Sequence, residues 1–123
     1  LQAENDILKK ENKFLKDNHI LEWGKFTVTA YTSLDEGCDN IAYSGLDIME
    51  LSKYITIVAV DKDLIALGTF VIIEKDGNYI DALALDIGGN IKGNKIDLYF
   101  RDDKEGAKKW GVQENINVGF LKQ

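Results

Sequence analysis

The sequence has 123 residues, which is enough for one domain with one hydrophobic core. Hydrophobic residues make up 45% of it and charged residues 29%, which is ordinary for a globular protein and argues against intrinsic disorder. The formal charge of −6, with no basic stripe to offset it, argues against nucleic acid as a partner. The apolar runs are much shorter than the ~20 residues of a membrane-spanning helix, so no membrane span is expected in this chain.

The N-terminal segment carries a helical heptad pattern. Leucine recurs every seven residues with asparagine between, at Leu1, Asn5, Leu8, Asn12 and Leu15. With leucine at d and asparagine at a, this is the pattern of a coiled coil, in which a polar a residue fixes register and oligomeric state. We therefore expect the end of a coiled coil over residues 1–23, and a homo-oligomer formed through residues 1–22. An amphipathic helix packed on its own domain through Ile7, Phe14 and Leu21 is the alternative.

The chain does not begin with Met, and no signal peptide precedes the charged helix. We therefore expect it to be part of a longer protein whose localisation signals lie elsewhere. Cys38 is the single cysteine, so the fold does not depend on an internal disulfide.

The period changes from helical to alternating near Lys25. Phe26, Val28 and Ala30 alternate with polar residues, which predicts a half-buried strand. Further strands are expected at residues 55–61, 69–75, 78–85, 96–100 and 116–122. Asp76-Gly77-Asn78 predicts a tight hairpin between two of these strands.

Two other segments complete the predicted domain. Residues 33–54 are expected to form a long functional loop that includes a short helical turn. A short helix is expected near the end of the chain, with Asp102 and Glu105 at its N-terminus and Gly111 at its end. Six strands with one late helix favour a small closed β structure, since closure removes exposed strand edges.

Three apolar segments each place an aspartate at or near a strand end: Asp61 after 58–60, Asp86 after 84–85, and Asp97 within 96–100. A carboxylate in such a position is costly to bury without partners, so these acids suggest a site.

Side-chain alternation separates the last of these acids from the predicted core. Ile96, Leu98 and Phe100 share one face of their strand, which leaves Asp97 and Tyr99 on the other.

Glycines surround the middle acid. Gly88, Gly89 and Gly93 allow tight turns, close approach of a ligand and exposed N–H groups. On spacing alone, a ligand-binding turn and a purely structural glycine turn are equally supported.

The whole stretch from Phe26-Thr27-Val28-Thr29-Ala30-Tyr31-Thr32 to Val118-Gly119-Phe120-Leu121, about four fifths of the chain, resembles the 3D domain. That family is named for its three aspartates. It occurs in stationary-phase-survival, YuiC-like and cell-wall-lytic proteins of Gram-positive bacteria, and in the catalytic barrel of MltA-type lytic transglycosylases. The most specific motif is Asp-x-Gly-Gly-x-Ile-Lys-Gly from Asp86, followed by Ile-Asp-Leu-Tyr around Asp97.

The resemblance implies a mainly β fold: a six-stranded double-psi β-barrel over residues 24–123 with one short late helix, preceded by the coiled-coil-like helix of residues 1–23. It also implies that Asp61, Asp86 and Asp97 are the three aspartates. Asp97 would be the acid and base, and the other two would line its cleft and support its protonation and orientation.

The implied activity is lytic cleavage of the β-1,4 bond between N-acetylmuramic acid and N-acetylglucosamine, with formation of a 1,6-anhydro sugar. The partner would be the glycan strands of peptidoglycan, with no cofactor and no metal. Tyr31, Ser44, Gly89 and Lys92 would contact the substrate. The location would be extracytoplasmic: the cell wall, the medium, or a phage virion or lysis component.

The implied reaction needs only one carboxyl group, because the attacking hydroxyl belongs to the substrate and no water has to be activated. Asp97 would have to hold a proton near neutral pH, and burial and repulsion from Asp86 both favour that state.

Departures from the family pattern lie outside the aspartates. Ala66 replaces the usual proline of Ile-Pro-Leu-Gly-Thr, and Tyr43 replaces the usual Thr or Lys before Ser-Gly, so the details of the substrate subsites are in doubt.

Two alternatives to this interpretation are open. One is a non-catalytic peptidoglycan-binding or structural module of a cell-wall or phage tail assembly. The other is a metal site at Asp61 and Asp63, or in the cluster Asp35, Glu36, Cys38 and Asp39. The single histidine, His19, lies outside the predicted domain, which disfavours zinc sites and nucleophile–histidine systems.

Overall fold

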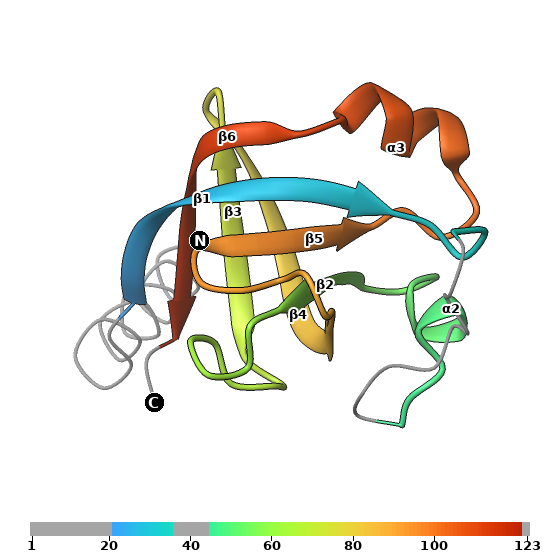
Figure 1. The fold of residues 1–123 in the computed structure, drawn as a ribbon, viewed down its shortest axis with the longest axis horizontal. Helices are drawn as coiled ribbons and strands as arrows, with labels where there is room; N and C mark the ends of the chain where they lie inside the picture. The colour runs from blue at the N-terminus through green and yellow to red at the C-terminus, as the bar shows by residue number, and fades with distance from the viewer. Residues whose placement is uncertain (1–20, 36–44, 122–123) are drawn as a thin grey trace, which may run out of the picture.

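The computed structural model describes residues 21–35 and 45–121. Within them, six strands close into a barrel in the order β1-β5-β2-β4-β3-β6 (Figure 1). The strands are β1 (Leu21–Tyr31), β2 (Thr56–Val60), β3 (Phe70–Lys75), β4 (Asn78–Ile87), β5 (Lys95–Tyr99) and β6 (Gln113–Leu121). Two short helices, α2 (Ile48–Leu51) and α3 (Lys104–Trp110), complete the described fold. In this part of the chain, no helix has the length and apolar character needed to cross a membrane.

The inner faces of the strands form one core. β1 pairs with β5, and β2 with β4, in parallel, while the remaining neighbours pair antiparallel. The largest fully buried side chains of this core are aliphatic: Val28, Val58, Val60, Ile65, Val71, Ile73, Ile96 and Val118. Closure leaves each strand with two partners, so no edge is exposed to pair with another chain.

The predicted mainly β, closed six-stranded architecture is confirmed, but the helical boundary is wrong. β1 begins at Leu21, so residues 21–23 belong to a strand rather than to the end of a helix. They pair with β6 from Leu21 opposite Leu121 onward, and this long-range pairing overrides the local heptad pattern. The predicted coiled coil over the preceding residues lies outside the described part of the chain.

The predicted hairpin between β3 and β4 is confirmed. Lys75 pairs with Asn78, which leaves Asp76 and Gly77 as a two-residue turn. Both have positive φ, 52° and 80°, as a type I′ turn requires.

The late helix is confirmed with its N-terminus one residue further along the chain. Asp103, not Asp102, is the N-cap, and its carboxylate accepts a hydrogen bond from the Gly106 N–H at 2.9 Å. Gly111 ends the helix at φ 62°. Trp110 fixes α3 to the barrel by donating from Nε1 to the Val28 carbonyl at 3.0 Å.

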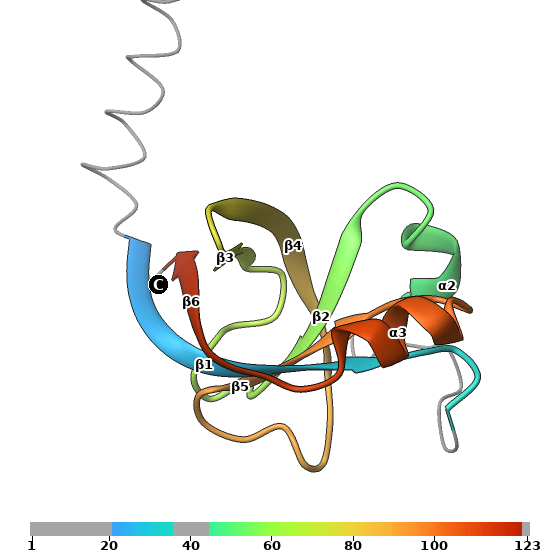
Figure 2. The ribbon, with the colours of Figure 1, turned by 90° about the horizontal axis from the view of Figure 1, so that it is seen from above.

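The helical turn expected within residues 33–54 is confirmed as α2, so the described fold has two short helices rather than one. Ile48 of α2 is 1% exposed and packs on the outside of the barrel against Ile57, Leu85 and Tyr99. Figures 1 and 2 both place α2 and α3 at the end of the barrel toward which β1 points. The two helices therefore lie at the same end of the barrel.

Candidate active site

Asp97 lies on the outer face of β5, as its alternation with buried neighbours predicts. Ile96 and Leu98 point into the barrel core, and Tyr99 joins the outer cluster under α2. Asp97 Oδ1 accepts a hydrogen bond from Thr29 Oγ1 at 2.9 Å. Within the described residues, Oδ2 has no hydrogen-bond partner.

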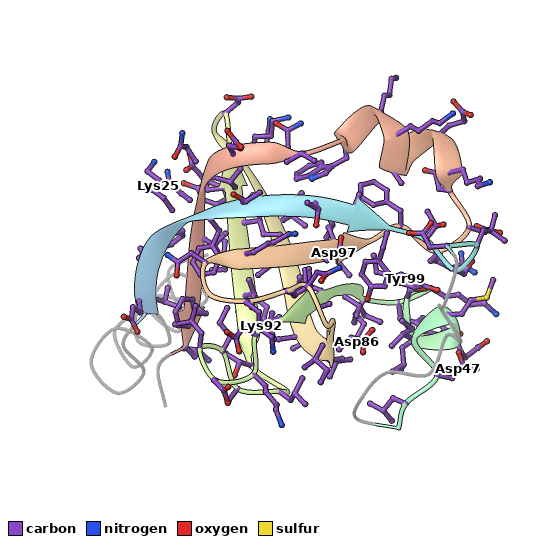
Figure 3. The ribbon with its side chains drawn as sticks, in the orientation of Figure 1. Lys25, Asp47, Asp86, Lys92, Asp97 and Tyr99 are labelled. Carbon is purple, nitrogen blue, oxygen red and sulfur yellow. The ribbon has the colours of Figure 1, made fainter. Side chains whose placement is uncertain are left out.

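The strand pairing places a second acid, Asp86, in the same row of paired residues as Asp97. Asp97 is paired with Thr29 on one side and with Ala59 on the other, and Ala59 is paired in turn with Asp86. Figure 3 shows Asp97 and Asp86 on opposite sides of the β2 ribbon. Two strand spacings place their Cα atoms about 10 Å apart. Because Ala59 has only a methyl group, little side chain separates the two carboxylates.

The surroundings of Asp97 favour its protonated form. Burial raises the pKa of the Asp97 carboxyl above its usual value, and the charges of Asp35 and Asp86 act in the same direction. The hydrogen bond from Thr29 and the charge of Lys95 lower the pKa of Asp97, but they do not outweigh burial.

Asp86 is held by a tyrosine and by its own strand. Tyr31 donates from its hydroxyl to Asp86 Oδ2 at 3.3 Å, and the Ile87 N–H donates to Oδ1 at 2.9 Å. The Tyr31 ring packs against Tyr99 with centroids 4.9 Å apart. A β-bulge between Val58 and Ala59 in the β2–β4 pairing makes Asp86, rather than Leu85, the partner of Ala59.

Asp61 has different hydrogen-bond partners from this pair. It is the first residue after β2, and its carboxylate accepts from the Gly93 N–H at 2.8 Å and the Asp63 N–H at 3.0 Å. These two bonds lower the pKa of Asp61. Asp61 is absent from the groups that shift the pKa of Asp97.

The residues predicted to contact the substrate lie in different places. Tyr31 lies in the site through its bond to Asp86. Gly89 and Lys92 are exposed in the connection between β4 and β5, and Figure 3 shows Lys92 on that connection. Ser44 lies outside the described residues.

The structure brings to Asp97 three residues that the sequence did not place there, although Asp35 was named as a candidate metal ligand. Thr29 and Ala59 enter the site only through their pairing with Asp97, and Asp35 enters through its charge. The alternation of β1 already put Thr29 on a polar face, but nothing local indicated which strand it would face.

The metal alternative has limited structural support. Among residues 21–35 and 45–121, no three His, Cys, Asp or Glu side chains are grouped so that they could hold a metal ion. Glu36, Cys38 and Asp39 of the proposed cluster lie outside these ranges.

Comparison with known proteins identifies the family. The 3D domain family model matches residues 56–122, which is more than half of the chain and includes all three aspartates. The chain belongs to the 3D domain family. Its relatives in Bacillus subtilis (strain 168) include the cell wall-binding protein YocH, 40% identical over 95 residues, and the putative cell wall shaping protein YabE, 39% identical over 93 residues.

These matches cover 77% and 76% of this chain but 31% of YocH and 21% of YabE. This 3D domain chain therefore spans less than a third of either relative.

Solved structures support the same barrel. The lytic transglycosylase MltA from Escherichia coli is 26% identical, with a TM-score of 0.52 over 67% of this chain and 27% of that one. MltA with bound chitohexaose matches with the same identity and coverage and a TM-score of 0.50. The Streptomyces papain inhibitor shares the fold, with 20% identity and a TM-score of 0.57 over 82% of this chain and 96% of that one.

Proposed function

We propose that this 3D domain is a peptidoglycan lytic transglycosylase in which Asp97 acts first as general acid and then as general base. The observation that carries the proposal is the position of Asp97, half-buried with a raised pKa, across Ala59 from Asp86. Asp86 is proposed to support the protonated form of Asp97 through its charge.

The reaction balances with one carboxyl group. Asp97 donates its proton to the glycosidic oxygen as the bond from that oxygen to muramyl C1 breaks. The muramyl 6-hydroxyl oxygen then bonds to C1, and its proton passes to the Asp97 carboxylate. Asp97 ends protonated as it began, so no second carboxylate is needed to activate water.

Proton transfer is assigned to Oδ2 of Asp97, because Thr29 already bonds to Oδ1 and fixes the orientation of the carboxyl group. Tyr31, Gly89 and Lys92, together with Ser44, are proposed to contact the glycan. Peptidoglycan strands as substrate are supported by the names of the wall-binding and wall-shaping relatives, and by the binding of chitohexaose, a related glycan, to MltA. An extracytoplasmic location, at the cell wall or in a phage particle, follows from such a substrate.

The finer fold assignments belong to the same proposal. The parallel pairs β1–β5 and β2–β4 support a barrel of the double-psi type. A coiled coil over the residues that precede β1 is proposed to join copies of the chain.

Digestion of purified Gram-positive peptidoglycan, followed by mass spectrometry for 1,6-anhydro products, tests the proposal. The wild type is expected to release these products, and Asp97→Asn is expected to lower the rate by about 100-fold or more, because the amide cannot transfer the proton. The variant should fold with an unchanged or higher Tm, since it removes a charge that burial disfavours.

Lys25→Ala serves as the matched control, because Lys25 lies in β1 four residues before Thr29, and Figure 3 shows it away from Asp97 and Asp86. Its activity should equal that of the wild type. An Asp97→Asn variant with activity within tenfold of the wild type would remove Asp97 from this role.

Glycan binding without cleavage is the second candidate, and the name of the wall-binding relative YocH favours it. Sedimentation of the protein with purified sacculi, without release of anhydro products by the wild type, would support this candidate over the enzyme.

A further inference from the structure

The connection between β4 and β5 joins two strands that are separated by a third strand in the barrel. It covers residues 88–94 and joins the strand that carries Asp86 to the strand that carries Asp97. In the barrel these two strands are not neighbours, because β2 lies between them. The connection therefore has to pass the C-terminal end of β2, where Asp61 is the first residue after the strand.

Asp61 is bonded to this connection where it enters β5. Asp61 Oδ2 accepts from the Gly93 N–H at 2.8 Å, and the Gly93 carbonyl accepts from the Lys95 N–H at 2.8 Å. Gly93 has a φ of 63°, in the left-handed region that residues with a Cβ rarely adopt. In this conformation its N–H donates to Asp61. Asp61 Oδ1 accepts from the Asp63 N–H at 3.0 Å, which fixes the carboxylate itself.

The other end of the connection is fixed by packing. Ile91 is 5% exposed, and its N–H donates to the Gly88 carbonyl at 3.1 Å. A Cβ on Gly88 would lie 2.8 Å from Ile91 Cγ1, so this turn closes tightly only with glycine. Packing thus holds the β4 end. At the β5 end, Asn94 is bonded to β1, where its carbonyl accepts from the Thr27 N–H at 3.0 Å and its Nδ2 donates to the Lys25 carbonyl at 3.1 Å. The bond from Gly93 to Asp61 ties the same end to β2.

We infer that Asp61 is a positioning residue that ties the β4–β5 connection to the end of β2, and so sets Asp97 and Asp86 on either side of Ala59. This inference rests on the proposed function, and it assigns Asp61 no contact with the substrate. It differs from the expectation that Asp61 lines the cleft and supports the protonation of Asp97 directly.

The ionisation of Asp61 agrees with this role. Two backbone N–H donors lower its pKa, so it is a carboxylate at neutral pH and has no proton to donate. It is not among the charges that shift the pKa of Asp97. Removal of Asp61 should therefore lower the rate without moving the pH dependence that Asp97 sets.

The experiment compares Asp61→Ala, Asp61→Asn and the matched control Asp63→Asn. Asp63→Asn removes a charge two residues away but keeps the backbone N–H that Asp61 accepts. Asp61→Ala removes both bonds, whereas Asp61→Asn keeps one acceptor oxygen.

We expect kcat to fall about 100-fold in Asp61→Ala, because small misplacements of reacting groups have effects of this size. Asp61→Asn should fall between Asp61→Ala and the wild type, and Asp63→Asn should match the wild type. Hydrogen exchange of the Gly93 amide, followed by NMR, should accelerate in Asp61→Ala and remain unchanged in Asp63→Asn.

Three outcomes would overturn the inference. The first is a Gly93 amide that stays protected from exchange in Asp61→Ala. The second is a shift, in either Asp61 variant, of the pH at which the rate falls as Asp97 loses its proton, and the third is an equal loss of kcat in Asp61→Asn and Asp63→Asn. If the wild type releases no anhydro products, the proposed function fails separately. In that case, hydrogen exchange of the Gly93 amide and the NMR signals of the Asp86 and Asp97 carboxyl groups test whether Asp61 positions the β4–β5 connection. These signals should change most in Asp61→Ala, less in Asp61→Asn and not in Asp63→Asn. No change in Asp61→Ala would refute the positioning role of Asp61.

Discussion

Burial is the main cause that favours the protonated form of Asp97, and two neighbours then act on its pKa in opposite directions. Thr29 donates to its carboxylate and so favours the charged form, whereas the charge of Asp86 favours the protonated form. An acid that must donate a proton is active only while protonated, so kcat/KM should fall as pH rises through the pKa of Asp97.

This balance predicts opposite shifts for two variants. Thr29→Val removes the hydrogen bond but keeps the shape of the side chain, so the pKa of Asp97 should rise and kcat/KM should fall at a higher pH. Asp86→Asn removes the repelling charge, so kcat/KM should fall at a lower pH. A pH profile of kcat/KM measures both, and shifts in the same direction would contradict the assignment.

At the scale of elements, α2 supports the site from outside the barrel. Its Ile48 packs against Tyr99, whose ring contacts Tyr31, and Tyr31 in turn donates to Asp86. A four-residue helix has little stability of its own, so its place depends on this packing and on the Asp47 N-cap, which accepts from the Glu50 N–H at 3.1 Å.

Ile48→Ala should therefore affect both stability and activity. Loss of this buried side chain should lower the free energy of unfolding by about 2–5 kcal/mol, measured by urea denaturation. Activity of the folded fraction should also fall, since the support of Tyr31 is weakened.

Lys53→Ala is the control, because it breaks only the exposed 3.0 Å ion pair with Glu50. Exposed pairs contribute about 0–1 kcal/mol, so this variant should remain close to the wild type. A control loss as large as that of Ile48→Ala would show that α2 is not held by its buried side chain.

At the scale of the whole molecule, all the strand pairs that close the barrel lie between Leu21 and Leu121. The barrel should fold without the residues that precede β1. The homo-oligomer predicted from the heptad pattern, in contrast, should depend on those residues.

A chain that starts at Leu21 should keep the Tm of the full chain within about 4 °C, which corresponds to a change below about 1 kcal/mol for a domain of this size. It should be a monomer in sedimentation equilibrium, while the full chain should associate. A monomeric full chain would refute the coiled-coil prediction without affecting the barrel.

Local patterns determined much of this fold. The alternation around Phe26 and Val28, the Asp76-Gly77 turn and the Gly111 stop each depend on neighbours a few residues apart, and the structure confirms them. The placement of Asp97 opposite the core side of its strand follows from the same period of two. The resemblance motif also singles out Asp86 and Asp97 as site residues.

Only the tertiary structure decided which residues meet. Thr29 reaches Asp97 across 68 positions of sequence, and Asp86 faces Asp97 because β2 inserts between their strands and presents Ala59. Pairing with β6 also makes residues 21–23 part of strand β1 rather than of the predicted helix. The physical reason is the same in each case: local periodicity selects the face of a strand, whereas the partner strand and its register are selected by burial of the whole core.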